Sequence, residues 1–268
     1  DRIFYSPAPL ERGGKTAFVF PGSGNHFLGM GRQVSAVWPE VFRRQNRETD
    51  SLRSHLVSDV FWQSGERHNL DDNHEALIFG QVAFGTIYSD LFQSFGVEPD
   101  AVIGYSLGET VGLFSMRVWR DRDEMLRRMD ETTLFTDDLA GACESVRRAW
   151  QLSDDEQVDW SLGVADCPAD TVREALQGRE RVYLLIVNTP VESVIGGDRM
   201  AVENLVADLG CAFHSIRGVT TVHCEVARPV ADAYHKLHLF PTHPPEGVTF
   251  YSGVFGGAYE VNTNSAAD

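Results

Sequence analysis

The stretch that decides the fold is residues 101–108, which read Ala-Val-Ile-Gly-Tyr-Ser-Leu-Gly. The three apolar residues predict a buried strand. The Gly-x-Ser-x-Gly pentapeptide after it is typical of a sharp strand-to-helix turn that presents one serine. Gly104 and Gly108 allow the chain to bend there without Cβ clashes. We therefore expect the hydroxyl of Ser106 to stand clear of the backbone. The N–H of Leu107 should be free to donate to a developing oxyanion.

Two further segments accompany this turn. Residues 16–20, Thr-Ala-Phe-Val-Phe, predict a second short strand, and the glycine-rich loop Pro-Gly-Ser-Gly-Asn-His follows at 21–26. Such a loop exposes N–H groups that can bind an anion, but an ordinary strand-to-helix connection fits equally well. The missing Gly-Lys-Ser/Thr ending argues against a phosphate-binding loop. The third segment, 222–229, reads Val-His-Cys-Glu-Val-Ala-Arg-Pro and contains His223.

Taken in order, the three segments resemble the acyltransferase domains of fatty-acid and polyketide synthases, the malonyl-CoA:acyl carrier protein transacylase family. The family's Phe-Pro-Gly-Gln-Gly-Ser-Gln reads Phe-Pro-Gly-Ser-Gly-Asn-His at 20–26, and its Gly-His-Ser-x-Gly-Glu reads Gly-Tyr-Ser-Leu-Gly-Glu at 104–109. Its Ser-His-x-x-x-Met-x-Pro corresponds to 222–229, with Val before the His and Ala for Met. Weaker matches are Asn-Thr-Pro at 188–190 and Tyr-Ser-Gly-Val at 251–254.

The resemblance implies a role for each matching residue. Ser106 would be the nucleophile, and His223 would take its proton and return it to the leaving thiol. The backbone N–H groups of Ser23 and Leu107 would form the oxyanion hole. The carbonyl of Gly253, where the family has Asn, would orient the imidazole. The implied reaction moves an acyl group from acyl-CoA to the serine, and then to the phosphopantetheine thiol of an acyl carrier protein. It needs no metal and no permanently bound cofactor.

Some positions depart from the family pattern and bear on the acyl pocket. Malonyl-selective members carry an arginine 25 positions after the serine, which pairs with the malonyl carboxylate. Glu131 stands at that position here, with Arg127 and Arg128 one turn earlier. One possibility is that Arg127 or Arg128 supplies the guanidinium that pairs with the carboxylate of the acyl group. The alternative is that Arg127, Arg128 and Glu131 form solvated ion pairs on a surface helix. Val222 replaces a phenylalanine that malonyl enzymes often have, which leaves room for a larger or uncharged acyl chain.

Two more residues concern the active-site cleft. Asn188, which belongs to one of the matching motifs, is expected on the cleft wall, and Tyr105 replaces the family's histidine beside the nucleophile. The change at Tyr105 and the changes above point away from malonate. They favour a divergent branch, such as the acyltransferases of polyunsaturated fatty-acid synthases or related iterative multienzymes.

The hydrophobic pattern predicts an α/β protein in two parts. Continuous apolar strands are typical of a parallel sheet covered on both faces, and helical spacing over 75–95 predicts an amphipathic helix before the second strand. Later in the chain the elements alternate in the order βαββαβ, a ferredoxin-like unit. The resemblance implies that such a subdomain is inserted in a hydrolase-like core. We expect a hydrolase-like parallel-sheet core at 1–139 and 213–268 and a ferredoxin-like subdomain at 140–212.

The composition restricts the partners. A net charge of −16 argues against nucleic-acid binding, and no apolar stretch is long enough to span a membrane. Four scattered cysteines without a Cys-x-x-Cys pattern indicate a reduced, cytoplasmic setting with neither a zinc site nor a disulfide framework. The expected partners are acyl-CoA, an acyl carrier protein and neighbouring synthase domains, because both ends of the chain look like cuts from a longer polypeptide.

The acidity is unfavourable for an anionic substrate such as coenzyme A, so clusters of arginine are of interest. Arg117, Arg120 and Arg122 form one such run, for which a solvated loop is the expected structure.

Two other functions fit the same residues. A serine thioesterase or other hydrolase would use the same Ser–His pair, usually with an Asp or Glu between them in the sequence. No acidic residue before His223 stands out for that role. A non-catalytic acyltransferase-like scaffold domain of a synthase would not need Ser106 at all.

Overall fold

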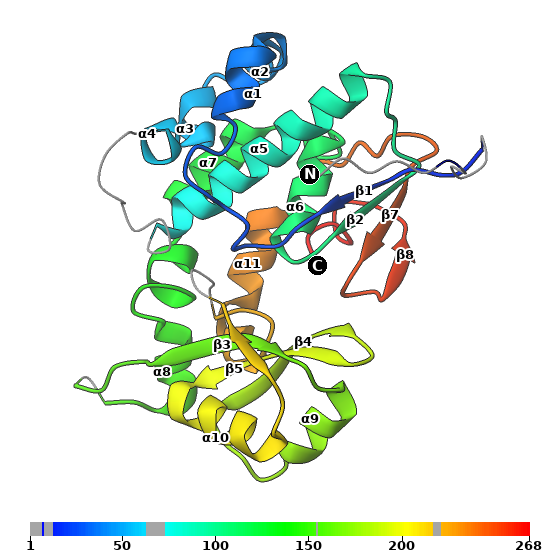
Figure 1. Ribbon diagram of the computed structural model, residues 1–268. Coiled ribbons are helices and arrows are strands. Elements are labelled where there is room, and N and C mark those ends of the chain that lie inside the picture. The colour runs from blue at the N-terminus through cyan, green and yellow to red at the C-terminus, as the bar shows by residue number, and fades with distance from the viewer. Residues whose placement is uncertain (1–6, 8–12, 63–72, 154, 217–220) are drawn as a thin grey trace.

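The computed structural model describes residues 7, 13–62, 73–153, 155–216 and 221–268. They form a larger and a smaller part, each built on a four-stranded sheet (Figure 1). The larger sheet has the strand order β1-β2-β7-β8, and its first three strands are parallel while β8 runs antiparallel to β7. These strands are β1 (Ala17–Phe20), β2 (Ala101–Gly104), β7 (Thr249–Ser252) and β8 (Gly257–Tyr259). The predicted α/β core is confirmed.

Side chains alternate between the two faces of this sheet. Phe20, Val102 and Phe250 are buried on the face that α6 (Leu107–Ser115) covers. On the other face, Val19, Ile103 and Tyr251 lie in register and are 67%, 39% and 41% exposed. We expected a sheet covered on both faces from its apolar strands, and this prediction is wrong for the described residues. Within the described residues, one face is packed and the other presents an apolar row to solvent.

The long helix α5 (His74–Ser94) begins where the Asn73 side chain accepts a hydrogen bond from the N–H of Ala76. It packs between α6 and a group of short N-terminal helices, so it is buried on two sides rather than amphipathic. Phe61 and Phe84 meet edge to face at this contact. The short helices are α1 (Arg32–Val37), α2 (Pro39–Gln45), α3 (Leu52–Leu56) and α4 (Ser58–Phe61).

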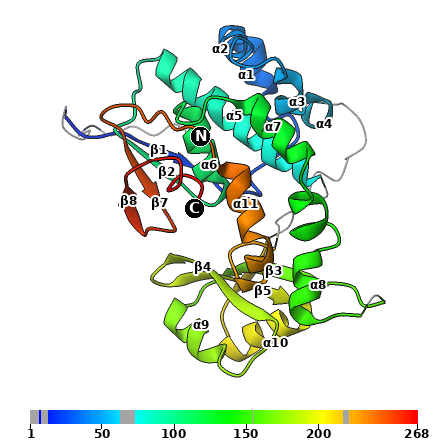
Figure 2. The ribbon, with the colours of Figure 1, turned by 180° about the vertical axis from the view of Figure 1, so that it is seen from behind.

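Three elements lead from the larger part to the smaller one. The helix α7 (Arg122–Asp130) begins at Asp121, whose side chain accepts from the N–H of Glu124. A π-helical turn, η2 (Leu134–Asp138), follows, and then α8 (Glu144–Trp150). Figures 1 and 2 show that α8 and α11 (Ala231–His238) extend between the two parts. A 3₁₀ turn, η3 (Glu225–Val230), precedes α11 and packs against α8.

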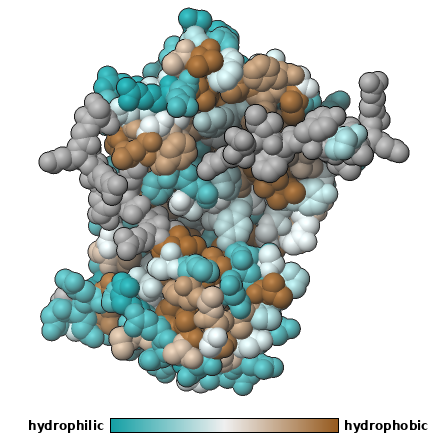
Figure 3. All heavy atoms as spheres, viewed as in Figure 1, coloured by the Kyte–Doolittle hydropathy of each residue, from teal (hydrophilic) through white to brown (hydrophobic). Residues whose placement is uncertain are grey.

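The smaller part confirms the predicted βαββαβ order. Its sheet is antiparallel with the order β4-β5-β3-β6, and α9 and α10 cover one face. Figure 3 shows mainly hydrophilic side chains along the lower end of the molecule, where these helices lie. The elements are β3 (Trp160–Ala165), α9 (Ala169–Ala175), β4 (Val182–Thr189), β5 (Glu192–Asp198), α10 (Arg199–Leu209) and β6 (Phe213–Ser215).

One boundary differs from the prediction. We expected the subdomain to end at residue 212, but Phe213–Ser215 pairs with β3 as the edge strand of the small sheet. A three-residue strand is too short to show a period, so its partner decides where it belongs. Among the described residues, no helix is both long and apolar enough to cross a membrane.

Candidate active site

The turn after β2 has the sharp geometry that its glycines predict. Ser106 lies between β2 and α6 with φ 53° and ψ −119°, a backbone conformation that is costly for a residue with a Cβ. A Cβ on Gly104 would lie 2.2 Å from the amide nitrogen of Glu109, and one on Gly108 would lie 2.2 Å from the carbonyl oxygen of Phe20. Backbone packs against backbone at both positions, so only glycine fits.

His223 lies opposite this serine. Its Nε2 is 2.8 Å from Ser106 Oγ, although 117 positions separate them in the sequence. The segment before the histidine is held by Thr221, whose N–H and hydroxyl both donate to the carbonyl of Leu139. His223 itself has φ 66°. Desolvation by the surrounding protein lowers the pKa of the imidazole below 6.5, even though the residue stays partly open to solvent. The ring is therefore neutral at pH 7 and can accept a proton.

The two expected oxyanion donors lie around the same cavity as the serine. Leu107 is the first residue of α6, so its N–H has no partner within the helix. Ser23 belongs to the glycine-rich loop after β1 and also lines the cavity. Gln81 of α5 fixes that loop, because its Nε2 donates to the carbonyl of Pro21 at 3.0 Å.

The segment that carries the expected orienting carbonyl is held by a contact of its own. The N–H of Gly253 donates to Glu109 Oε1 at 2.9 Å, which holds the segment after β7 against the first turn of α6. In the described part of the chain, Ser106 is the only hydrogen-bond partner given for His223. Sequence reasoning missed Glu109, although it is the last residue of the motif that revealed the serine.

Tyr105 and Asn188 connect the two parts of the molecule. The Tyr105 hydroxyl donates to Asn188 Oδ1 at 2.8 Å, and Asn188 Nδ2 donates to Glu192 Oε1 at 2.8 Å. This chain of hydrogen bonds joins the turn at the nucleophile to β4 and β5. Neither Tyr105 nor Asn188 lines the cavity beneath the serine.

Arg128 and Glu131 lie away from that cavity. Arg127 forms ion pairs with Glu124 and Glu131 on the exposed side of α7. Arg128 donates to the carbonyls of Leu237 and Leu239 and lies 4.1 Å over the ring of Phe240. The solvated pairing weighed as an alternative is thus present for Glu131, and Arg128 ties α7 to the end of α11. The structure does not bring either residue to Ser106.

The cavity itself has a volume of about 530 Å³, within the range of small-molecule sites. Ser106, His223 and Val222 lie on its wall. Its other walls come from α5, α6 and α7 and are mostly apolar, with Leu77, Phe79, Leu113, Met125 and Met129 among them. Polar and charged residues line it as well, among them His55, Glu109, Arg122, Arg228 and Asp268.

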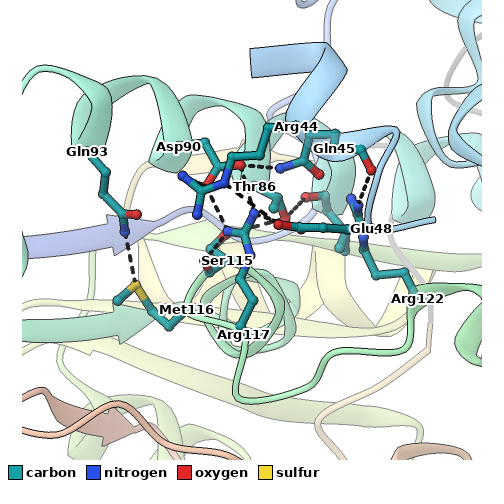
Figure 4. Close-up of polar contacts among 11 residues, drawn as sticks. Arg44, Gln45, Glu48, Thr86, Asp90, Gln93, Ser115, Met116, Arg117 and Arg122 are labelled. Atoms are coloured by element: carbon teal, nitrogen blue, oxygen red, sulfur yellow. Dashed lines mark hydrogen bonds and ion pairs between the residues drawn. The ribbon is translucent and has the colours of Figure 1, made fainter. Parts of the chain in front are cut away.

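Of the three arginines expected in a solvated loop, Arg122 is buried, Arg117 is half-buried and paired, and only Arg120 is exposed. Figure 4 shows Arg117 between Asp90 and Glu48, with nitrogen–oxygen distances of 2.8 Å and 2.9 Å. Arg122 is only 5% exposed, while Arg120 is exposed. The helices α2 and α5 pack against this arginine run, and the local sequence pattern does not predict that packing.

Within the described ranges, no group of three or more His, Cys, Asp or Glu side chains could hold a metal ion. His238 is buried, and its Nδ1 lies 2.9 Å from the carbonyl of Tyr234. Burial raises the pKa of the Cys224 thiol to about 11, so this neighbour of His223 stays protonated.

Comparison with known proteins places this geometry in context. No protein-family model matches the chain. One component of the polyunsaturated fatty acid synthase of Thraustochytrium sp. is 24% identical over 269 residues, which cover 93% of the chain and 13% of that protein. The mycoketide-CoA synthase of Mycobacterium tuberculosis is 39% identical over 102 residues, or 36% of the chain and 2% of that protein. The chain thus spans a small fraction of the synthases it matches.

Solved structures agree on the fold. The acyltransferase domain from module 8 of the salinomycin polyketide synthase has a TM-score of 0.73 at 22% identity, covering 94% of this chain and 58% of that one. The malonyl-CoA:acyl carrier protein transacylase of Helicobacter pylori has a TM-score of 0.71 at 17% identity, covering 94% and 77%. The chain has the fold of the acyltransferase domains of polyketide synthases and of the malonyl-CoA:acyl carrier protein transacylases, and its sequence is similar to parts of polyketide and polyunsaturated fatty-acid synthases.

Proposed function

We propose that this chain transfers an acyl group from coenzyme A to Ser106, and from there to the phosphopantetheine thiol of an acyl carrier protein. The observation that carries the proposal is the contact between Ser106 Oγ and His223 Nε2, at 2.8 Å, on a strained turn above a cavity that can hold an acyl chain. A nucleophile within hydrogen-bond reach of its base is the arrangement that acyl transfer through a covalent intermediate needs.

The first half of the reaction follows from this contact. His223 takes the proton of Ser106 as the oxygen attacks the thioester carbonyl. The negative charge that develops on the carbonyl oxygen is stabilised by the N–H groups of Leu107 and Ser23. When the tetrahedral intermediate collapses, the C–S bond breaks and His223 gives its proton to the departing thiolate of coenzyme A. In the second half, the carrier thiol attacks the ester by the same steps in reverse.

A neutral base is the form that this mechanism requires. The lowered pKa of His223 supplies it at pH 7. The carbonyl of Gly253 is our proposed partner for Nδ1 of the imidazole, in place of the carboxylate of a triad. The chain supplies every group in these steps, so no metal or permanently bound cofactor is required.

The proposed setting is the cytoplasm, within a larger synthase. Four unpaired cysteines fit a reducing compartment. Acyl-CoA and an acyl carrier protein are the proposed partners, together with neighbouring domains of the same multienzyme. A net charge of −16 argues against a nucleic-acid partner.

Intact-protein mass spectrometry after brief incubation with acyl-CoAs tests the proposal. We expect a mass increase equal to one acyl group, lost in Ser106→Ala and strongly reduced in His223→Ala. An adduct that persists in Ser106→Ala would place the acyl group elsewhere. A folded protein that forms no adduct with any donor would overturn the proposal and leave the scaffold function.

The fate of the acyl group separates a transferase from a hydrolase. Acylated protein is mixed with carrier protein in its phosphopantetheine form, and both the acyl carrier and the free acid are measured. We expect the carrier to gain the acyl group faster than water does. Release mainly as free acid would favour the thioesterase alternative. The absence of a carboxylate among the hydrogen-bond partners given for His223 in the described residues supports a transferase.

A further inference from the structure

The helix α7 turns one face to the cavity and the opposite one to solvent. Arg122, Met125 and Met129 line the cavity at spacings of three and four residues, which is one side of a helix. Arg127 and Glu131 lie on the exposed side, where they pair with each other. At 1.5 Å of rise per residue, Arg122 stands about 10 Å along the helix axis from Met129 and about 13 Å from Glu131.

Arg122 is buried without the partners that a buried guanidinium needs. The residue is 5% exposed, and its Nη1 has no hydrogen-bond partner among the described residues. Its Nη2 reaches the carbonyl of Gln45 only at 3.5 Å, the limit of a hydrogen bond. Burial lowers the pKa of this guanidinium. A planar group with five N–H donors is therefore left almost unsatisfied at the wall of an apolar cavity.

The nearby carboxylates are engaged elsewhere. Asp90 accepts from Gln45 and from both terminal nitrogens of Arg117, and Glu48 accepts from Arg117 as well (Figure 4). No ion pair with Arg122 occurs in the part of the chain that the structure describes. The charge of this arginine is thus not neutralised by direct contact with the acids of its own cluster.

Asp123, the next residue, is also occupied. Its carboxylate accepts from the Thr49 hydroxyl, the N–H of Asp50 and His55 Nε2. Although burial acts to raise it, these hydrogen bonds bring the pKa of Asp123 down to about 2. His55 therefore lines the same end of the cavity with one ring nitrogen already committed.

We propose that Arg122 binds a carboxylate at the far end of the acyl chain, so that the cavity selects medium-length acyl groups with a terminal carboxylate. This inference rests on the proposed function. A carboxylate would pair with the guanidinium in a fork and satisfy its buried donors. The two methionines and Leu113 would contact the methylenes between the thioester and that end. The position of Arg122, far along the helix from Glu131, implies a longer chain than malonyl.

Paired donors test this inference. Acylation rates are measured for acyl-CoAs of three to twelve carbons, each with and without a terminal carboxylate. We expect the carboxylated donor to react at least tenfold faster than its neutral counterpart at some medium length. Arg122→Met should remove that preference and leave the neutral rates within about threefold. Arg122→Lys should retain part of it, because an ammonium binds a carboxylate only as a point charge.

Controls keep the result interpretable. Arg127→Met removes an arginine from the opposite side of α7 and should leave the preference unchanged. If Arg122→Met does not fold, the thermal stabilisation of Ser106→Ala by carboxylated and neutral acyl-CoAs of equal length measures the same selectivity without altering Arg122. Equal reactivity of the paired donors at every length, or a preference that survives in Arg122→Met, overturns the inference and leaves the proposed function intact. No adduct from any donor overturns both.

Discussion

The two ends of the cavity are built in opposite ways. At the serine end, the backbone sets the geometry: two glycines and the strained backbone of Ser106 itself, with φ 53°, present the hydroxyl at 2.8 Å from its base. At the Arg122 end, side chains that meet across four helices set it, and one guanidinium lacks partners. The turn at the serine end is local, and its base, although 117 positions away in the sequence, is already in place. The Arg122 end is assembled entirely from distant segments and, in our proposal, is completed by the substrate.

The contrast indicates where reactivity and selectivity reside. Bond making needs a fixed nucleophile, which backbone packing provides. Selection among acyl groups needs a cavity wall whose side chains can change without disturbing the turn that carries Ser106. The serine end should therefore respond to any change with a loss of all acylation, whereas the Arg122 end should respond with a change in preference.

The largest effect is expected from Gly108→Ala. The new Cβ would lie 2.2 Å from the backbone oxygen of Phe20, which no side-chain rotation can relieve. We expect a loss of about 3 kcal/mol in the free energy of unfolding and the loss of acylation with every donor. Chemical denaturation and mass spectrometry measure the two quantities. Gly257→Ala is the matched control, because nothing lies within 4 Å of its Cβ position. A Gly108→Ala variant as stable and active as the wild type would show that the turn is not held by backbone packing.

The pH dependence of acylation should report the base at the serine end. Burial lowers the pKa of His223 below 6.5, and only the neutral ring accepts the serine proton. The rate should be constant above pH 7 and fall tenfold per pH unit once the pH drops below that pKa. Rapid-quench measurements from pH 4.5 to 8.5 give the profile. His55, whose pKa burial also lowers, lies at the other end of the cavity, so His55→Gln should keep the same acid limb. A midpoint above pH 7 would contradict this assignment.

A moderate effect is expected from Tyr105→Phe, which separates the turn from the small sheet. The variant loses the hydrogen bond to Asn188, worth about 0.5–1.5 kcal/mol, and kcat/KM should fall roughly two- to tenfold. The fall should be equal for carboxylated and neutral donors, unlike the effect of Arg122→Met. Tyr251→Phe is a suitable control, since both tyrosines are 41% exposed and no hydrogen bond from the Tyr251 hydroxyl is described. A change in the preference between carboxylated and neutral donors would show that Tyr105 also contributes to acyl-group selectivity.

The smallest effect is expected from Glu131→Gln. The side chain is 63% exposed and paired with Arg127 on the solvent side of α7. Exposed ion pairs contribute about 0–1 kcal/mol, so stability, rate and donor preference should stay within twofold of the wild type. The paired-donor assay measures the last quantity. A fivefold gain for carboxylated donors would return a specificity role to this position.

These differences explain what the sequence could predict. The turn at Ser106 is five residues long and carries its own signal, and the βαββαβ order follows from periods that each element shows alone. The cluster around Arg122 has no such signal. Its partner Gln45 is 77 positions away in the sequence, at the end of α2. The arginines after α6 therefore looked like a solvated loop.

Helix phase accounts for another failure. Counting 25 positions from Ser106 leads to Glu131, but the side chains of α7 that reach the cavity are those at 122, 125 and 129. A sequence count fixes distance along the chain and not the direction in which a side chain points. The predicted βαββαβ order already includes β6 as its last strand, and only the boundary expected at residue 212 separated it from β3, with which it pairs.

The glycines of the turn have a consequence for how such a domain can diversify. Backbone atoms fill the space that a side chain at Gly104 or Gly108 would need. Even the smallest side chain, that of alanine, would therefore clash at either position. The cavity face of α7 is the reverse, since the unbranched side chains of Met125 and Met129 adapt to neighbours of different shape. New acyl preferences should therefore arise by drift along one face of a helix, while the chemistry at Ser106 is inherited unchanged.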